Sequence, residues 1–140
     1  MDAKDLMIGD WVEVTRTECV PDGGHYMTWS EYGKVIGVTD SYIEVEVRDG
    51  GYNVDAHEDE FKPIPLTPEI LEKNGFEQKQ SEFINGDIEI IFTIKGFSFW
   101  SKKTIEIAHG NGSKINNLPC YVHQLQHALR LCGIYKEIEI

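Results

Sequence analysis

Alternation of apolar and polar residues predicts a group of short strands in the first half of the chain. The strand patterns cover residues 8–14, 33–39, 42–48, 52–57 and 60–64. The second and third of these form a hairpin through the turn residues Asp40 and Ser41, and a long polar loop is expected through residues 21–24. Because several short strands in so short a segment can pair their own edges, the pattern predicts a small curled β-barrel.

The second half of the chain opens with a short helix and continues with a hairpin. Thr67 is a natural N-cap, Pro68 suits the first helical position and Gly75 suits the C-cap. Asn85-Gly86 between two apolar runs is a strong hairpin signal. Strand patterns follow at residues 83–84, 87–95, 97–101 and 104–109.

A longer helix is predicted near the C-terminus, with Asn116 or Asn117 as its N-cap, Pro119 in its first turn and Gly133 just past its end. One arc of about 120° holds its apolar side chains. These are Leu118, Tyr121, Val122, Leu125, Ala128, Leu129 and Cys132. The order helix, about three antiparallel strands, helix predicts an α+β layer with helices on one face. Residues 134–140 alternate like a further strand.

Prolines and charge divide the chain into two predicted domains. Three prolines lie within residues 62–68, where regular structure should break. Residues 1–66 carry 15 acidic and 5 basic side chains, whereas residues 67–140 carry 9 and 8. We therefore predict an acidic β-barrel over residues 1–66 and an α+β domain over residues 67–140. The acidic half would repel phosphates, so nucleic acid is an unfavourable partner and a basic protein or peptide a favourable one.

Residues 9–14 (Gly-Asp-Trp-Val-Glu-Val) and 33–38 (Gly-Lys-Val-Ile-Gly-Val) resemble the opening hairpins of SH3-like barrels of the Tudor and KOW type. The resemblance implies an SH3-like barrel that binds peptides, RNA or DNA. Five aromatic residues either line a peptide groove or fill the small core. They are Trp11, Tyr26, Trp29, Tyr32 and Tyr42.

His123 and His127 have the i, i+4 spacing that lets one helix hold a zinc ion. The helical wheel places both opposite the apolar arc, so they are expected to face solvent unless another element covers them. In zinc peptidases a Glu beside the first His takes the proton of the metal-bound water, but here that position is Gln124, and an amide cannot accept the proton. A solvated or interface face is thus favoured, and a metal-dependent hydrolase stays as the alternative.

Two other groups of reactive side chains have competing interpretations. Cys19, Cys120 and Cys132 are an odd number, and the latter two lie about 18 Å apart on one predicted helix, so reduced thiols are expected. Cys120 near a helix start is either a nucleophile or, more commonly, a buried structural thiol. The acidic run at residues 55–60 either attracts a divalent cation or is a solvated strand edge.

Residues 63–76, together with residues 121–127 and Gly133, resemble a group of small uncharacterised proteins from Bacteroidetes genomes and their phages. The resemblance implies a cytoplasmic or phage-encoded protein and transfers no catalytic residue. Where others of the group have an apolar or amide residue, this chain has His127. No apolar stretch approaches the roughly 20 residues of a membrane span, which again favours a soluble cytoplasmic protein.

The function predicted from sequence is a non-enzymatic interaction module that binds a protein or peptide partner. No catalytic triad, phosphate loop, nucleotide fingerprint or spaced cysteine site competes with this interpretation, so no cofactor is expected. The hydrolase built on His123 and His127 is the first alternative. A barrel that reads nucleic acid is the second, weaker one.

Overall fold

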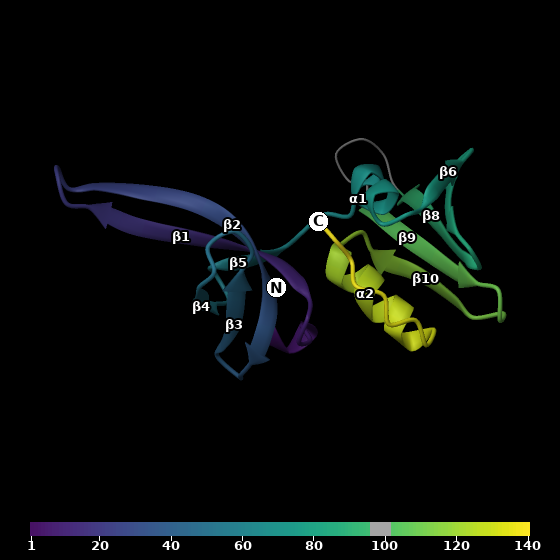
Figure 1. Cartoon of the computed structure of the whole chain (residues 1–140), viewed down its shortest axis with the longest axis horizontal. Helices are drawn as coiled ribbons and strands as arrows, with labels where there is room; N and C mark the ends of the chain where they lie inside the picture. The colour runs from purple at the N-terminus through teal and green to yellow at the C-terminus, as the bar shows by residue number, and fades with distance from the viewer. Residues whose placement is uncertain (96–101) are drawn as a thin grey trace. The chain divides into compact units, whose positions relative to one another are not determined.

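The computed structural model of the chain describes residues 1–95 and 102–140. It divides into two compact units, unit 1 (Met1–Ile64) and unit 2 (Pro65–Ile140). The boundary expected from the prolines lies two residues further along the chain. The strand predicted at residues 97–101 lies outside the described residues. The chain is an α+β protein in which antiparallel sheet dominates (Figure 1).

Unit 1 is a five-stranded antiparallel sheet in the order β4-β3-β2-β1-β5. Its elements are the 3-10 helix η1 (Ala3–Asp5) and strands β1 (Trp11–Val20), β2 (His25–Val38), β3 (Tyr42–Val47), β4 (Asn53–His57) and β5 (Phe61–Pro63). The hairpin predicted at Asp40-Ser41 is confirmed by the pairing of β2 with β3. Among the described residues no sheet closes on itself, because β4 and β5 remain its two edges.

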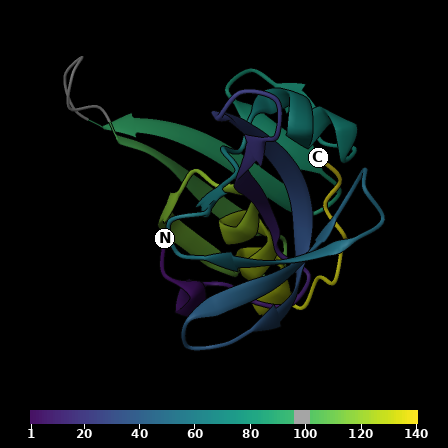
Figure 2. The same ribbon diagram turned by 90° about the vertical axis from the view of Figure 1, so that its left-hand side faces the viewer.

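The core of unit 1 lies on one face of this sheet. Its buried members are Ala3, Leu6, Val12, Val14, Val35, Ile43, Val45, Ala56 and Phe61. Alternate residues of the strands point to this side, which we call the core-side face. A register shift between Val35 and Gly37 bends β2 (Figures 1 and 2). Gly33 permits the close approach of β3, since an added Cβ would lie 2.4 Å from Val45 Cγ1.

The expected loop at residues 21–24 is instead the tip of a long two-stranded arm, so the strand predicted to end at Val14 was too short. β1 continues to Val20 and β2 starts at His25, and their paired ends extend beyond the other strands (Figure 1). Residues 15–18 lack an apolar face, which is why the pattern hid the strand. Cross-strand hydroxyl contacts hold the arm, including Thr17 Oγ1 to Thr28 Oγ1 at 2.9 Å.

Unit 2 holds a second antiparallel sheet, in the order β10-β9-β8-β7-β6, and two helices. Its elements are α1 (Pro68–Lys73), β6 (Glu77–Lys79), β7 (Glu82–Asn85), β8 (Ile88–Lys95), β9 (Lys102–His109), β10 (Lys114–Pro119) and α2 (Val122–Leu131). The predicted hairpin at Asn85-Gly86 is confirmed, with its turn one residue later than expected, because Asn85 pairs with Ile88. Buried Ile90, Ile105 and Ile107 mark the inner face of this sheet.

Both ends of helix α1 have the caps that its sequence predicts. Thr67 Oγ1 accepts the amide hydrogen of Ile70, Pro68 is the first helical residue, and Gly75 adopts φ 82° just past the C-cap. Phe76 N–H then bonds to Leu71 C=O at 3.0 Å and Gly75 N–H to Glu72 C=O at 3.0 Å, the hydrogen-bond pair of a Schellman motif.

Helix α2 begins later than predicted. Val122 is its first residue, and the segment assigned to its first turn is strand β10, so neither Asn116 nor Asn117 is its N-cap. Asn117 has φ 59° at a register irregularity of β10, a conformation that Asn tolerates. The predicted end is confirmed, since Gly133 has φ 78° and Ile134 N–H bonds to Leu129 C=O at 2.8 Å.

The C-terminal tail is not the strand that its alternation predicted. It lies against the end of α1, where the buried Asn74 side chain donates to the carbonyls of Ile70 and Glu139, each at 2.7 Å, and accepts from Glu139 N–H at 2.8 Å. Lys136 Nζ donates to Asn74 C=O. Hydrogen bonds to one side chain therefore take the place of a strand ladder. No described helix has the length and apolar character needed to cross a membrane.

Asn74→Ala should lower the free energy of unfolding by about 2–4 kcal/mol, because buried partners lose their hydrogen bonds. Urea denaturation measures the loss, and hydrogen exchange at the Glu139 amide reports release of the tail. Asn74→Asp is the matched control: it keeps the acceptor for Glu139 N–H but cannot donate to either carbonyl, so we expect a loss of stability without equally fast exchange at Glu139. Unchanged stability of Asn74→Ala would contradict this account of the tail.

Candidate functional site

Unit 2 has a pocket where its helices leave one end of the inner sheet face uncovered, and we call it the sheet-end pocket. Inner-face residues continue along β8 and β9 past the buried core to Ile94, which pairs with Lys103 and is 64 % exposed. Both helices begin beside this end, α1 after Thr67 and α2 after Tyr121. The resulting cavity has a volume of about 880 Å³.

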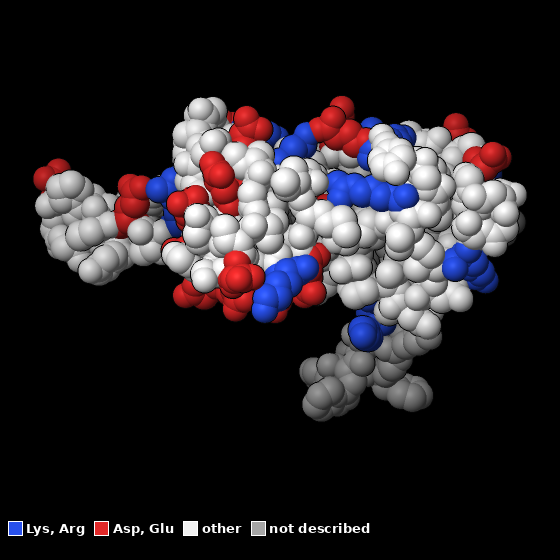
Figure 3. Space-filling model, turned by 90° about the horizontal axis from the view of Figure 1, so that it is seen from below, with Lys and Arg blue, Asp and Glu red and all other residues white. Residues whose placement is uncertain are grey.

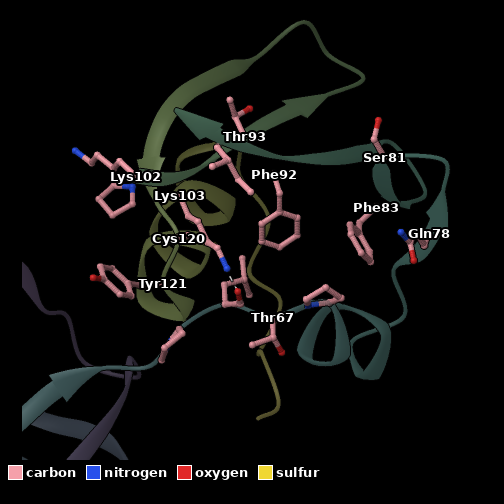
Figure 4. A pocket seen from close by; sticks show the side chains of 15 residues that line it. Thr67, Gln78, Ser81, Phe83, Phe92, Thr93, Lys102, Lys103, Cys120 and Tyr121 are labelled. Carbon is pink, nitrogen blue, oxygen red and sulfur yellow. Dashed lines mark hydrogen bonds between the residues drawn. The ribbon is translucent and has the colours of Figure 1, made fainter. Parts of the chain in front are cut away.

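The lining of the sheet-end pocket is largely apolar (Figure 4). Its residues are Pro65, Leu66, Thr67, Pro68, Gln78, Ser81, Phe83, Phe92, Thr93, Ile94, Lys102, Lys103, Pro119, Cys120 and Tyr121. Phe83 and Phe92 meet edge to face, with ring centroids 5.6 Å apart. One wall is formed by the segment just before α1, which is fixed in place: Leu66 N–H bonds to Cys120 C=O at 3.0 Å, and Pro65 forms a β-bridge with Tyr121.

Two lysines are the charged residues of this lining, and they point in different directions. Figure 4 shows Lys103 reaching into the pocket toward Thr67, whereas Lys102 extends away from it. This matches the strand alternation, because Lys103 shares the inner face with Ile94 and Lys102 lies on the other face. No carboxylate is among the described lining residues.

Cys120 lies in the wall of the pocket and has the properties of a structural thiol. Its Sγ donates to Leu66 C=O at 3.4 Å. Burial raises the pKa of the Cys120 thiol, and the positive charge of Lys103 offsets only part of that rise. A raised pKa keeps the nucleophilic thiolate scarce, which disfavours the nucleophile considered from the sequence.

His123 does not face solvent, so the stated exception, that the rest of the chain covers the pair, applies to it. It is 3 % exposed, with Gln126 buried beside it, while His127 is half-buried. The apolar stripe identified only the apolar part of the buried surface of α2. His123 lies on the opposite side of the helix and is buried there as well, because polar side chains can be buried when they are hydrogen-bonded. The His123 ring stacks on Tyr121 at 5.9 Å and lies 5.7 Å from the His127 ring.

This geometry gives the metal interpretation no support. Gln124 Nε2 lies 3.1 Å from His123 Nε2, so a ring nitrogen that a metal would use is in a hydrogen bond. Over residues 1–95 and 102–140, no group of three His, Cys, Asp or Glu side chains is placed to hold a metal ion. The acidic run at residues 55–60 likewise forms no such group among the described residues. Its Glu60 Oε2 accepts a hydrogen bond from His57 N–H at 2.9 Å, which closes the turn before β5.

The five aromatic residues predicted for unit 1 do not share one groove. Trp11, Tyr26, Tyr32 and Tyr42 lie on the outer face of the sheet, whereas Trp29, opposite Arg16, lies on the core-side face of the arm. Trp11 is buried under Lys34, whose Nζ is 5.1 Å from its ring centroid. Tyr32 and Tyr42 contact Arg48 and His57, and Tyr26 is 74 % exposed.

A second, polar cavity lies at the foot of the arm, and we call it the base pocket. Its volume is about 410 Å³, and its lining comprises Val14, Thr15, Arg16, Thr17, Tyr52, Asn53, Val54, Asp55 and Glu60. Tyr52 donates its hydroxyl to Glu31 Oε2 at 2.7 Å, and this hydrogen bond raises the pKa of Tyr52. The Arg16 guanidinium lies over the Tyr52 ring, with its Cζ 5.6 Å from the ring centroid. The carboxylates of the lining are those of Asp55 and Glu60.

Comparison with known protein families, with curated proteins and with solved structures finds no match. Both resemblances drawn from the sequence therefore stay predictions. The site must be interpreted from its own residues. Sequence reasoning did not find the sheet-end pocket, although one signal was available: Lys103 falls on an apolar strand face, one step beyond Ile105 and Ile107.

Cys120 should react with iodoacetamide more slowly than the exposed Cys19, because burial limits both its access and its thiolate fraction. Lys103→Met should slow Cys120 further, since loss of the neighbouring cation raises the thiol pKa. Rates at several pH values, followed by peptide mass spectrometry, measure both effects. Lys102→Met is the matched control and should leave the rate unchanged; faster alkylation in Lys103→Met would refute the assigned cause.

Proposed function

We propose that unit 1 is a non-enzymatic interaction module that binds a basic segment of a protein partner. The single observation that carries this proposal is the combination, within unit 1, of an exposed arm bearing aromatic side chains and a carboxylate-lined pocket at its foot. Each part suits a different portion of one peptide.

Charge favours a basic partner. Unit 1 holds 15 acidic against 5 basic residues, a net of −10, while unit 2 has a net of −1. Figure 3 shows acidic side chains gathered over unit 1 on the face that it draws. Such a surface attracts cationic segments over about 8–10 Å at physiological salt and repels phosphate backbones. A protein partner is therefore preferred to nucleic acid.

The arm offers apolar anchors to such a segment. Trp29 is half-buried on its core-side face, and neighbouring Met27 on the same face is 60 % exposed. Aromatic and Met side chains contribute strongly at protein interfaces because they bury large areas at low entropic cost. Since the arm extends beyond the rest of the sheet, a partner can reach these side chains without disturbing the core.

The base pocket, at the foot of the arm, supplies the charged part of the proposed binding site. Asp55 and Glu60 line it, and Arg16 links it to Trp29, which is its cross-strand neighbour. A cavity of about 410 Å³ with two carboxylates suits the head of one Lys or Arg side chain. We infer a peptide that places a basic residue in the base pocket and an apolar residue on Trp29.

The assignment of unit 1 to a particular type of β-barrel is also part of this proposal. We infer that unit 1 is an SH3-like barrel, an inference supported by its five antiparallel strands, its tight β4–β5 turn and the bulge that bends β2. Peptide recognition is one of the activities that such barrels support. The hydrolase alternative has no comparable observation in its favour.

Selection from a displayed library of random peptides tests the function. The intact protein should enrich peptides in which Lys or Arg lies near an apolar residue, and the enrichment should weaken with added salt. Trp29→Ala and the double variant Asp55→Asn/Glu60→Gln should each abolish it. The double variant Glu58→Gln/Asp59→Asn, which changes the net charge equally outside the base pocket, should retain it.

Two results would contradict the proposal. One is a failure to enrich basic peptides at all. The other is an equal loss in both double variants, which would mean that only net charge attracts the peptides and that the base pocket recognises nothing. Circular dichroism of every variant confirms that each is folded before its result is compared.

A further inference from the structure

We propose that the sheet-end pocket of unit 2 binds a small anionic amphiphile, a molecule with one carboxylate group and an apolar aliphatic body. This site lies in the other unit from the proposed peptide surface and does not depend on that function. Three observations carry the inference: the apolar lining, the inward lysine and the absence of carboxylates from the described lining.

The pocket can take up the apolar body. Its volume of about 880 Å³ lies within the range of about 300–1,000 Å³ that is usual for small-molecule sites. Phe83 and Phe92 face it from β7 and β8, and Ile94 leaves 64 % of its surface exposed beside them. An aliphatic chain laid over these side chains would complete the cover that the helices do not provide for this end of the inner face.

Lys103 can hold the carboxylate. Its side chain reaches into the pocket, and among the described residues it forms no salt bridge. A cation without an acidic neighbour is unusual in a chain with 24 acidic and 13 basic residues. Lys103 itself is exposed, so its charge-assisted hydrogen bond to a carboxylate would strengthen only as the apolar body of the ligand covers the pair and excludes water.

Helix α2 adds to the positive character of this pocket. Its N-cap Tyr121 lines the cavity and makes no side-chain capping hydrogen bond, and no acidic residue occupies the first turn of the helix. The positive end of the helix dipole is therefore not offset by a nearby carboxylate of that turn. It supports Lys103 but does not by itself define the site.

The arrangement favours a carboxylate over a phosphate ester. A phosphate monoester carries close to two negative charges near neutral pH and needs several donors. Here one lysine points inward, while Figure 4 shows Ser81 and Thr93 directed away from the pocket centre. One cation above an apolar floor matches one negative charge on an apolar body.

Calorimetric titration with decanoate tests the proposal on the full chain. We expect one saturable site, weaker binding of acetate, which lacks the apolar body, and no binding of decylammonium at the same concentration. Lys103→Met keeps the apolar stem and removes the charge, so it should weaken decanoate binding about tenfold, which corresponds to about 1.4 kcal/mol. Lys79→Met, at an exposed lysine outside the pocket lining, is the matched control and should change the affinity by less than about twofold.

A second variant keeps the test informative if Lys103→Met perturbs the wall. Ile94→Glu places a negative charge at an exposed lining position and should abolish decanoate binding, whereas Ile94→Gln should reduce it only modestly. The proposal is overturned if decanoate does not bind below millimolar concentration, or if Lys79→Met and Lys103→Met weaken its binding equally. Binding to vesicles of phosphatidylcholine and phosphatidylglycerol without saturable binding of free decanoate would also overturn it, because the surface would then recognise a bilayer.

Discussion

Alternation of side chains along the strands is the constraint on which both units of this protein depend. It gives each sheet one apolar face, and that face must be covered by other elements of the chain or left open to a ligand or partner. In unit 1 the core-side face is covered around Val12, Val14 and Val35 but continues uncovered into the arm. In unit 2 the inner face is buried around Ile90 and Ile105 but, within the described part of the chain, continues to the exposed Ile94. Both candidate surfaces are thus extensions of a core.

The two extensions differ in chemistry, and the difference follows from which residues continue the alternation. In the arm, the residue after the last buried valine on that face is Arg16, with Trp29 opposite, and carboxylates lie at its foot. On β9, the residue that follows Ile105 toward the open end is Lys103, with Ile94 opposite. An acidic surface with aromatic anchors suits a basic peptide, whereas a lysine over an apolar floor suits an anionic amphiphile. Separate units can therefore carry separate binding activities.

Sequence reasoning found the elements whose signals are local. Thr67, Pro68 and Gly75 specify α1, Gly133 specifies the end of α2, and the hairpins follow from turn residues and period-two alternation. It failed where tertiary contacts decide. The tail alternates like a strand yet is held by Asn74, and the first turn predicted for α2 pairs with β9 instead. The candidate sites were harder to find, because a pocket depends on where covering elements stop, which no local pattern records. His123 shows the same limit, since it is buried on the side of α2 opposite the apolar stripe, and no local pattern records what covers that side.

The most direct test of this account is amide chemical-shift mapping of the full chain with two probes added separately, decanoate and a short lysine-rich peptide containing leucine. The account predicts that decanoate shifts resonances around Phe92, Lys103 and Tyr121, and that the peptide shifts those around Trp29, Asp55 and Glu60. Each probe should leave the other set of resonances unshifted. Shifts of one common set by both probes, or shifts by neither, would contradict the claim that each sheet offers its own uncovered end as a binding surface.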